Sequence, residues 1–425
     1  MKILVLGSGA REHAIILALR SEEAAHDILA APGNAGIAQD ATLVDVDPLD
    51  GAAIAGFANA NAVDLVIVGP EAPLVAGVAD VLRERGIPVF GPGRAAAQLE
   101  GSKAFAKRIM DAAGVPTGRA VRAATLAQVE AAFDDLGAPH VVKADGLAAG
   151  KGVIVTDDRA EALAHATQYL PAGPVLVEEF LSGPEVSLFF LSDGDTVRPL
   201  SPAQDFKRAH DGDAGPNTGG MGAYSPLPWL ADRFGSTEAF VDEVTRTVAT
   251  PVIRQLDAEG TPFIGLLYAG LILTPAGIRV IEFNARFGDP ETQVVLPRLV
   301  TPLSALLFAA ASGTLEDQPQ PAFSDEVAIT VVLASEGYPE APRTGRLIEG
   351  LGEAEAIDGV RIVHAATAGP DAPGGTLVAS GGRVLNVVAT GSDFADARAR
   401  AYEAIGRIRL DGGHYRRDIA ARVAS

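Results

Sequence analysis

Cysteine is absent from the 425 residues of this sequence, and positive charge is scarce. Without cysteine the chain forms no disulfide, thiolate metal site, iron–sulfur cluster or thiol nucleophile, which fits a reducing compartment such as the cytoplasm. Its 34 Lys and Arg residues stand against 54 Asp and Glu residues, which gives a formal net charge of −20. Such a surface repels nucleic acid and anionic membranes, so a phosphate-bearing ligand must bind at a local cluster of cations.

Long apolar runs are missing as well. The longest, near residues 263–273, is far shorter than the ~20 residues that cross a bilayer, and the apolar stretch at residues 3–6 is too short for a secretory leader. We therefore expect a soluble, cytoplasmic protein that binds neither nucleic acid nor membranes. At about 150 residues per domain, the length predicts two to four domains.

Lysine is the rarer of the two cations, with six residues among the 34. A compact, flexible ammonium group suits other purposes than the planar fork of arginine. Isolated surface lysines would explain any one of them equally well, but four of the six lie in segments that resemble motifs: Lys103, Lys143, Lys151 and Lys207.

The first hundred residues alternate between short apolar runs and amphipathic stretches. Strands are expected at residues 2–6, 27–31, 64–68 and 87–90, with helices at 12–20, 50–59 and 74–85. This alternation predicts a doubly wound parallel sheet, in which ligands bind beyond the carboxyl ends of the strands. Three loops should therefore face one crevice, and they contribute Gly9, Asn34, Gly36 and Glu71 as candidate substrate-binding residues.

The first of these loops, residues 7–12, is a broken dinucleotide fingerprint. Glu12 stands where the third glycine belongs, and residues 30–32 offer no carboxylate for the ribose of NAD. A glycine turn before a helix still forms an anion site through free backbone N–H groups. The loop therefore favours a sugar phosphate or another small anion over a dinucleotide, and a tight turn without ligand is the plain alternative.

The remaining chain divides into a central and a C-terminal part. A helix is expected from residue 102, then strand-rich segments, then a helical region at 237–258, and residues 317–321 look like a linker. Beyond it, strands are expected at 327–334 and 383–389 and a helix at 393–408. These patterns predict domains at residues 1–101, 102–321 and 322–425.

Two segments of the central part suit a nucleotide. Residues 140–153 place Lys143 on a strand and Lys151 in the glycine loop that follows, an arrangement suited to a polyphosphate. A hairpin turn with a solvated lysine would give the same pattern. Farther on, a strand ends in an acidic pair that could be either a solvated turn or a backbone hinge for adenine, with a ribose acceptor shortly after: Glu178, Glu179, Phe180, Leu181 and Glu185.

The strongest signal lies in residues 279–292. Alternate residues of a strand share a face, so Glu282, Asn284 and Arg286 should project together. Carboxylate and amide oxygens are the hard ligands that Mg²⁺ prefers, and arginine supplies a fork for phosphate. A polar face on an edge strand would explain the alternation but not the chemistry of these three side chains.

Two further clusters accompany these segments. Asp205 and Lys207 lie in a stretch of mixed charge, and residues 215–222 form a second glycine loop with amide and hydroxyl groups that we expect to be exposed. Such a loop suits a small zwitterion or anion through Asn217, Thr218, Gly219 and Gly220, although each cluster alone could be no more than a loop. The seven histidines show no metal-binding spacing and are interpreted as structural.

Together these segments resemble the ATP-grasp ligases, and among them the phosphoribosylamine–glycine ligase family. The resemblance rests on residues 7–13, 32–36, 69–74, 100–103, 143–152, 215–224 and 282–293. Ala285 and Phe206 depart from residues that relatives can carry, but neither lies on the expected ligand face. The fold implied is a multidomain α/β and α+β arrangement: an N-terminal α/β domain, an ATP-grasp domain with a small lid at about residues 122–188, and a C-terminal α+β domain.

The resemblance also implies roles for the candidate residues. Lys103 and Lys143 would contact the phosphates of ATP, the segment from Glu179 to Leu181 the adenine, and Glu185 the ribose. Lys151 and Glu178 would belong to the same nucleotide-binding site. Glu282 and Asn284 would hold Mg²⁺ or Mn²⁺, and Arg286, Lys207 and Asp205 would serve catalysis.

The implied activity joins glycine to 5-phosphoribosylamine through glycyl phosphate, with ATP converted to ADP and phosphate, in purine biosynthesis. These small molecules would be its partners, and the chain would be a monomer or a weak homo-oligomer. Three alternatives remain open from the residues: another ATP-grasp carboxylate–amine ligase with a different acceptor, a nicotinamide-dependent oxidoreductase, and a non-catalytic nucleotide-binding regulator.

Overall fold

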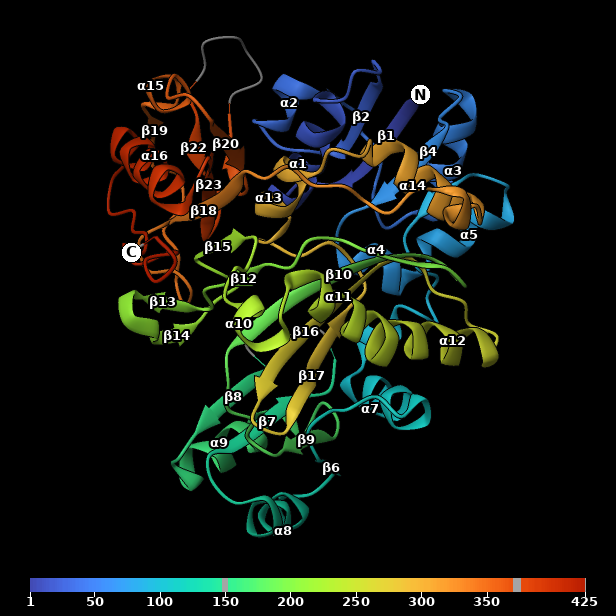
Figure 1. The fold of residues 1–425 in the computed structure, drawn as a ribbon, viewed down its shortest axis with the longest axis vertical. Helices are drawn as coiled ribbons and strands as arrows, with labels where there is room; N and C mark the ends of the chain where they lie inside the picture. Colours follow the sequence, from blue (N-terminus) through green and yellow to red (C-terminus); the bar gives the residue numbers. More distant parts are fainter. Residues whose placement is uncertain (147–151, 370–375, 425) are drawn as a thin grey trace.

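The N-terminal sheet has five strands, all parallel, in the order β3-β2-β1-β4-β5 (Figure 1). The computed structural model describes residues 1–146, 152–369 and 376–424. The strands are β1 (Lys2–Gly7), β2 (Asp27–Pro32), β3 (Thr42–Leu43), β4 (Leu65–Val68) and β5 (Val89–Phe90). Residues 3–6 of β1 are fully buried, as expected for a central strand covered on both faces. The predicted doubly wound sheet is therefore confirmed.

Helices connect these strands and cover the sheet. They are α1 (Ala10–Arg20), α2 (Ile37–Asp40), α3 (Gly51–Ala60), α4 (Glu71–Ala76) and α5 (Val78–Glu84). The prediction of one helix over residues 74–85 is wrong, because α4 ends at Ala76 and is followed by Gly77, whose φ of 86° lies in the left-handed region. Only glycine adopts this conformation without strain, so the chain turns there before α5 begins.

A small antiparallel sheet, the lid, projects from the rest of the molecule (Figure 1). Its order is β6-β9-β7-β8, with β6 (Ala120–Ala123), β7 (His140–Ala144), β8 (Val153–Thr156) and β9 (Val175–Glu178). Helices α8 (Leu126–Leu136) and α9 (Arg159–Tyr169) pack on it and form a separate apolar core around Phe133. The chain reaches the lid from α6 (Gln98–Gly101) and α7 (Lys103–Ala113). The lid end expected at about residue 188 falls inside the next strand, β10, which pairs in another sheet.

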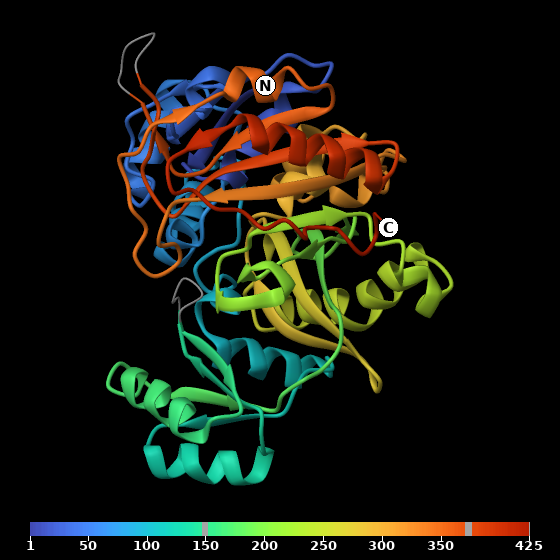
Figure 2. The same ribbon diagram turned by 90° about the vertical axis from the view of Figure 1, so that its left-hand side faces the viewer.

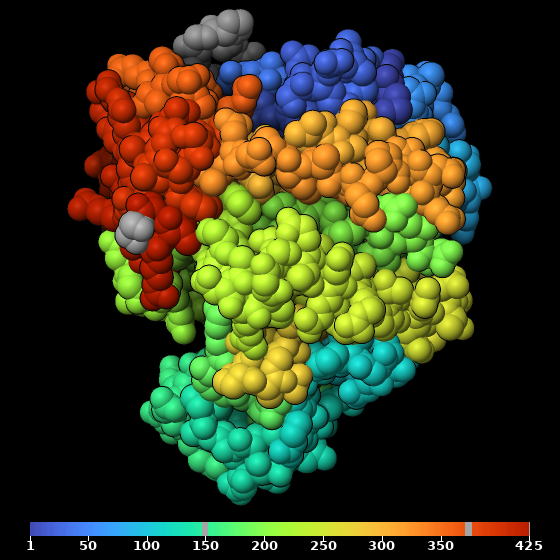
Figure 3. Space-filling model, in the orientation of Figure 1, coloured from blue at the N-terminus to red at the C-terminus, as the bar shows by residue number. Residues whose placement is uncertain are grey.

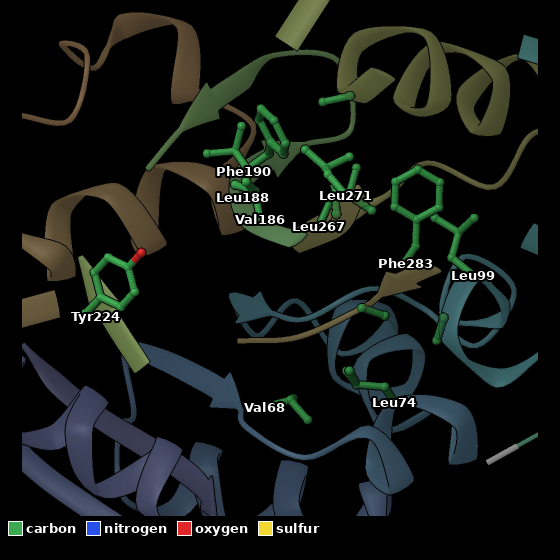
Figure 4. Packing of buried hydrophobic residues seen from close by; sticks show 14 of the residues in the cluster. Val68, Leu74, Leu99, Val186, Leu188, Phe190, Tyr224, Leu267, Leu271 and Phe283 are labelled. Atoms are coloured by element: carbon green, nitrogen blue, oxygen red, sulfur yellow. The ribbon is translucent and has the colours of Figure 1, made fainter. Parts of the chain in front are cut away.

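The central sheet is antiparallel, in the order β11-β10-β16-β17. Its strands are β10 (Glu185–Asp193), β11 (Val197–Pro199), β16 (Ile264–Thr274) and β17 (Gly277–Asn284). Helices α10 (Leu230–Phe234), α11 (Thr237–Val244) and α12 (Thr250–Ala258) follow one another over it, with a π-helical turn at Thr245–Ala249. In Figure 4, Phe190 of β10 and Leu267 of β16 lie above Val68 and Leu74 of the N-terminal domain, within one apolar cluster. Each such side chain contributes about 1.5–3 kcal/mol when fully buried.

The third large sheet crosses the boundary predicted at residue 321. Its order is β12-β15-β18-β23-β20, with β12 (Gln204–Asp205), β15 (Gly222–Ser225), β18 (Val327–Ala334), β20 (Val360–His364) and β23 (Arg383–Gly391). The first two strands come from the middle of the chain. Helices α15 (Leu351–Glu355) and α16 (Phe394–Arg407) pack on this sheet. Helix α13 (Thr292–Val295) contacts both this sheet and α1, while α14 (Leu303–Ser312) lies against the N-terminal and central parts.

Three short strand pairs complete the fold. They are β13 (Arg208–His210) with β14 (Ala214–Asn217), β19 (Ile348–Glu349) with β24 (Arg409–Leu410), and β21 (Thr367–Ala368) with β22 (Val378–Ala379). Figure 2 shows the C-terminal part beside the N-terminal sheet, with the lid apart from both. No helix among the described residues is long and apolar enough to span a membrane.

The C-terminal part contacts the loops at the carboxyl ends of the N-terminal strands. Asn34 Nδ2 donates to the carbonyl oxygens of His364 and Ala365, both at 3.1 Å. The backbone N–H of His364 donates to His13 Nδ1 at 2.9 Å, so His13 donates through Nε2 to Asp40 at 3.1 Å. These contacts hold the predicted substrate loops against β20.

Gly36 packs against the ring of His364, and a substitution there tests this contact. A Cβ atom at Gly36 would overlap the ring of His364, although the φ of −76° suits any residue. We expect Gly36→Ala to lower the free energy of unfolding by about 1–3 kcal/mol through overpacking. His364→Ala in the same chain should recover part of this loss, as measured by urea unfolding of the two single variants and the double variant. Strictly additive losses would contradict the proposed clash.

Candidate active site

Glu282 on β17 lies at the centre of the predicted cations. Burial alone would raise the pKa of its carboxyl group, but the charges of Lys207, Lys143, Lys103 and Arg286 outweigh burial and lower that pKa. The structure thus brings together five of the predicted residues: Lys143 from the lid, Lys103 from α7, Glu282 and Arg286 from β17 and the loop after it, and Lys207 from the loop between β12 and β13. A group of cations around an ionised carboxylate can receive a phosphate chain with a bound metal.

The strand around Glu282 has the predicted alternation. Glu282, Asn284 and Arg286 are half-buried, whereas Phe283 and Ala285 between them are buried. Glu282 stands opposite Gly270 of β16. The pairing register shifts at this point, because the next residue of β16, Leu271, pairs with Val280 rather than Ile281. The absence of a side chain at Gly270 leaves room for the carboxylate, because a Cβ there would lie 3.2 Å from Glu282 Cγ.

Two of the predicted lysines reach the site from different elements, α7 and β7. Lys103 begins α7 directly after the N-cap Ser102, and its Nζ donates to the carbonyl oxygen of Gly146 at 3.2 Å. Lys143 is buried on β7, where its Nζ lies 3.1 Å from Glu178 and donates to the carbonyl oxygen of Ile281 at 3.3 Å. Burial lowers the pKa of Lys103. The third predicted lysine, Lys151, lies outside the described residues.

Lys207 belongs to the same group of cations and lies among acidic side chains. Lys207 Nζ lies 2.8 Å from Glu185 Oε2, and the two side chains keep 36% and 43% of their exposure, so water reaches them. Burial outweighs the charge of Lys207 and, with Glu291 and Glu185 adding to it, raises the pKa of Asp205 to about 7. Conversely, Glu185 and Asp205 outweigh burial and raise the pKa of Lys207. Asp205 can therefore exchange a proton near neutral pH.

The glycine loop before β15 differs from the prediction of exposed amide and hydroxyl groups. Thr218 donates to the carbonyl oxygen of Lys207 through its N–H at 2.8 Å and through its hydroxyl at 2.9 Å. The N–H of Gly220 donates to Thr218 Oγ1, and that of Gly219 donates to the hydroxyl of Tyr338, both at 3.0 Å. Asn217 pairs with Arg208 in the β13–β14 hairpin. The loop is adjacent to Lys207, but the hydroxyl of Thr218 and the N–H groups of Thr218, Gly219 and Gly220 already bind protein atoms.

Arg383 of β23 was not predicted and also holds this loop. It donates to the carbonyl oxygens of Gly219 and Asp289, and its NH2 group lies 3.0 Å from the carboxylate of Asp289. The C-terminal part therefore fixes two segments of the site at once. An arginine 94 residues from its acidic partner gives no local sequence signal for this contact.

Glu12 fills the turn that resembles a dinucleotide fingerprint. Its carboxylate is buried and accepts from the N–H of Gly9 at 2.6 Å and from Arg11 Nε at 2.7 Å. Side chains at Gly7 or Gly69 would overlap it. Because a carboxylate occupies the helix N-terminus, a pyrophosphate finds repulsion there, which counts against the nicotinamide alternative. It also means that the N–H of Gly9, expected to bind an anion, is already bonded.

Asn34 has a structural role in its loop. Besides its bonds to the C-terminal part, described above, its Nδ2 donates to the carbonyl oxygen of Ser8 at 2.8 Å. Its Oδ1 accepts from the N–H groups of Gly36 and Ile37, both at 2.9 Å. Every polar atom of the side chain is therefore engaged within the protein. Gly36 is needed for its close contact with His364, as described above. These two residues shape the crevice that was predicted to bind substrate.

Arg286 connects this crevice with the cation cluster. Its guanidinium lies 3.0 Å from Glu100 and 3.5 Å from Glu71, and these carboxylates outweigh burial and raise its pKa. Burial raises the pKa of Glu71, but Arg286 and Arg11 outweigh it and lower that pKa. Burial raises the pKa of Glu100, whose carboxylate also accepts from the N–H of Ala285 at 2.8 Å. Glu100 and Arg11 were not predicted as site residues.

The predicted adenine segment begins beside the lysines. Glu178 is buried and lies 3.2 Å from Lys107 and 3.1 Å from Lys143, so it is not a solvated turn. Glu179 exchanges two bonds with the backbone of Arg119, and Phe180 is 45% exposed. Lys107 was missed although it follows Lys103 by one helical turn, a spacing that places both on one face of α7.

The match to known families follows the chain from end to end. Residues 1–100 match the N domain of phosphoribosylglycinamide synthetase, residues 101–292 its ATP-grasp (A) domain, and residues 328–422 its C domain. The chain belongs to this family. The predicted family and fold class are thereby confirmed, and members of the ATP-grasp family use ATP with a divalent metal.

Relatives agree over their full lengths. A phosphoribosylamine–glycine ligase of Leifsonia xyli is 72% identical over 424 residues, and one of Streptomyces coelicolor is 58% identical over 426 residues, with 100% of each chain covered. The crystal structure of the Thermotoga maritima phosphoribosylamine–glycine ligase is 32% identical and superposes with a TM-score of 0.81, covering 98% of this chain and 100% of that one.

Asp205 gives a pH prediction. The folded chain keeps its proton up to about pH 7, whereas the unfolded chain loses it near the ordinary pKa of 3.8, so the stability of the folded state falls as pH rises from about 4 to about 7. Asp205→Asn should remove this decrease, as measured by urea unfolding across that range. The exposed Asp195→Asn is the matched control and should keep the slope of the wild type. Parallel curves for all three proteins would contradict the assignment.

Proposed function

We propose that this chain catalyses the ATP-dependent ligation of glycine to 5-phosphoribosylamine, giving glycinamide ribonucleotide, ADP and phosphate in purine biosynthesis. The observation that carries the proposal is the convergence of three lysines and Arg286 on Glu282 in a chain that matches the ligase family along its length. We also propose that it works in the cytoplasm, as a monomer or weak homo-oligomer. Its domains would be residues 1–101, 102–321 and 322–425, with β12 and β15 of the second domain completing the sheet of the third.

Glu282 and Asn284 would hold Mg²⁺ or Mn²⁺. Their donor set fits, because the ionised Glu282 and the amide of Asn284 are hard oxygen ligands on one face of β17. Among the described residues no three His, Cys, Asp or Glu side chains form a metal site, so phosphate oxygens and water would complete the octahedron. When bound, the metal neutralises charge on the phosphates and orients them for transfer.

In the first step the carboxylate of glycine attacks the γ-phosphorus of ATP and ADP leaves, which forms glycyl phosphate. Arg286, Lys103 and Lys143 would stabilise the charge that spreads over the transferring phosphoryl group. No protein nucleophile is needed, so the catalytic power rests on position and electrostatics. Adenine would bind along Glu179–Leu181 and ribose at Glu185, while Glu178 would hold the lysines in place.

In the second step the nitrogen of phosphoribosylamine attacks the acyl carbon and phosphate leaves. The amine must give up a proton as the amide forms, and Asp205, with its pKa of about 7, can take it while Lys207 steadies the charge. Glu71, at the crevice proposed for the acceptor, lies 3.5 Å from Arg286, so the acceptor would bind beside that arginine. Figure 3 shows a recess between the lid and the β13–β14 hairpin. Movement of the lid toward the rest of the protein would cover the acyl phosphate there and exclude water.

The ligation itself is directly testable. The protein, ATP, Mg²⁺, glycine and phosphoribosylamine together should release ADP and form the amide ribonucleotide. Omission of glycine should stop ADP release, and replacement of phosphoribosylamine by other amines should stop amide formation. If ADP release does not depend on glycine, the proposal is wrong; if another amine is the better acceptor, the chain is a different carboxylate–amine ligase.

Glu282→Ala tests the metal assignment. Removing one of two protein ligands should reduce kcat by at least about a hundredfold, since each metal contact stabilises the transferring charge. Far-ultraviolet circular dichroism should be unchanged. The exposed Glu349→Ala on β19 is the matched control and should keep wild-type activity. A normal kcat in Glu282→Ala would show that the metal binds elsewhere.

A further inference from the structure

Two chain segments connect the lid with the rest of the protein, and they run side by side. Residues 114–119 lead into the lid and residues 179–184 lead out. The N–H of Glu179 donates to the carbonyl oxygen of Arg119 at 3.0 Å, and the N–H of Arg119 donates to the Glu179 carboxylate at 2.9 Å. Any reorientation of the lid must therefore pass through this pair of segments.

Lys107 contacts the segment that leads into the lid and the residue just before the segment that leads out. Its Nζ donates to Thr117 Oγ1 and to the carbonyl oxygen of Gly118 on the incoming segment, both at 2.9 Å. It also lies 3.2 Å from Glu178 Oε2, at the end of the last lid strand. The Lys107 side chain is only 12% exposed. These contacts tie the base of the lid to α7, the helix that begins with Lys103.

The number of donors decides what Lys107 can do. A lysine ammonium has three N–H bonds, and the three acceptors around Lys107 account for all of them. No N–H is left for a phosphate oxygen. By contrast, the bond of Lys103 Nζ within the described part of the chain is the one to Gly146, which leaves donors for a ligand. Lys107 is therefore suited to hold protein atoms rather than nucleotide.

Glu178 links Lys107 to a lysine that does face the site. The same carboxylate oxygen lies 3.1 Å from Lys143 Nζ, and Lys143 also donates to the carbonyl oxygen of Ile281, next to Glu282. One carboxylate shared by two ammonium groups leaves a net charge of +1. Without Lys107, Glu178 would neutralise Lys143 fully and weaken its attraction for phosphate.

We propose that Lys107 is a positioning residue that fixes both ends of the lid to α7 and shares Glu178 with Lys143, so that Lys143 stays oriented and positive toward ATP. The inference rests on the proposed function for its kinetic consequences, but its effect on nucleotide binding does not. It extends the site to a residue that touches no substrate. Burial lowers the pKa of Lys107 while Glu178 opposes this, as expected for a charge held by few, close partners.

Lys107→Met removes the charge and the three bonds while keeping the length of the side chain. Loss of a charged hydrogen-bond partner predicts that affinity for ADP with Mg²⁺, measured by calorimetry, falls about tenfold or more and that KM for ATP rises in parallel. KM for glycine should change less than about twofold, because the contacts of Lys107 with Thr117, Gly118 and Glu178 do not include the loop at residues 217–220 that was predicted to bind a small zwitterion. More ADP should form per amide product, since a loosened lid admits water to the acyl phosphate.

Arg108→Met is the matched control. It removes a positive charge at the next position of α7, where Arg108 pairs with Glu259 on the exposed side of the helix. This variant should bind ADP and couple ATP use to product as the wild type does. Equal nucleotide affinity and equal coupling in Lys107→Met and Arg108→Met would overturn the proposal, as would an equal loss of ATP and glycine binding accompanied by a lower melting temperature.

A double-mutant cycle separates charge sharing from packing. In Lys107→Met with Glu178→Gln, a neutral amide replaces the carboxylate and the local charge returns to +1, so the double variant should bind ADP more tightly than Lys107→Met does. ADP binding in the double variant that is no tighter than in Lys107→Met would overturn the charge-sharing part. If Lys107→Met does not fold, Thr117→Val removes one acceptor of Lys107, together with the bond that the Thr117 hydroxyl donates to the carbonyl oxygen of Val280, and should shift ADP affinity in the same direction. Calorimetry needs no turnover, so a wild type that binds ADP but ligates nothing would refute the proposed function and leave this inference testable.

Discussion

The site depends on holding like charges close together. Lys103, Lys143, Lys207 and Arg286 surround Glu282 inside a protein whose net charge is −20, and their mutual repulsion would separate them in the absence of acids between them. The structure supplies these acids one by one, from different elements: Glu178, Glu185, Glu71 and Glu100. The cluster is thus partly neutralised before any phosphate arrives, which lets it exist in the free protein.

Much of this arrangement could be predicted because it follows from local periodicity. The period of two along residues 282–287 placed Glu282, Asn284 and Arg286 on one face, and the structure has that alternation of burial. The alternating strands and helices of the first hundred residues likewise predicted the parallel sheet and its order of loops. The break at Gly77 escaped prediction, since apolar residues continue on both sides of it and only the backbone conformation interrupts the helix.

What could not be predicted are contacts between residues far apart in sequence. Nothing near Glu12 indicates that it occupies the glycine turn, and nothing near Arg383 indicates that it reaches Gly219. For the same reason the donors of Asn34 and Thr218 were expected to face a ligand, whereas long-range and loop partners consume them. Lys107 differs, because its position one turn after Lys103 was visible; what was missing was the buried acid that it shares.

The sheet that combines β12 and β15 with three C-terminal strands has a wider consequence. Cutting the chain at the boundary suggested by composition would strip β15 of its neighbour β18 and expose a row of unpaired backbone groups next to Lys207. The part that carries the chemistry is therefore not a portable module. Outer loops of the C-terminal part can be shortened without touching this sheet, but its central strand β18 cannot be removed without exposing β15.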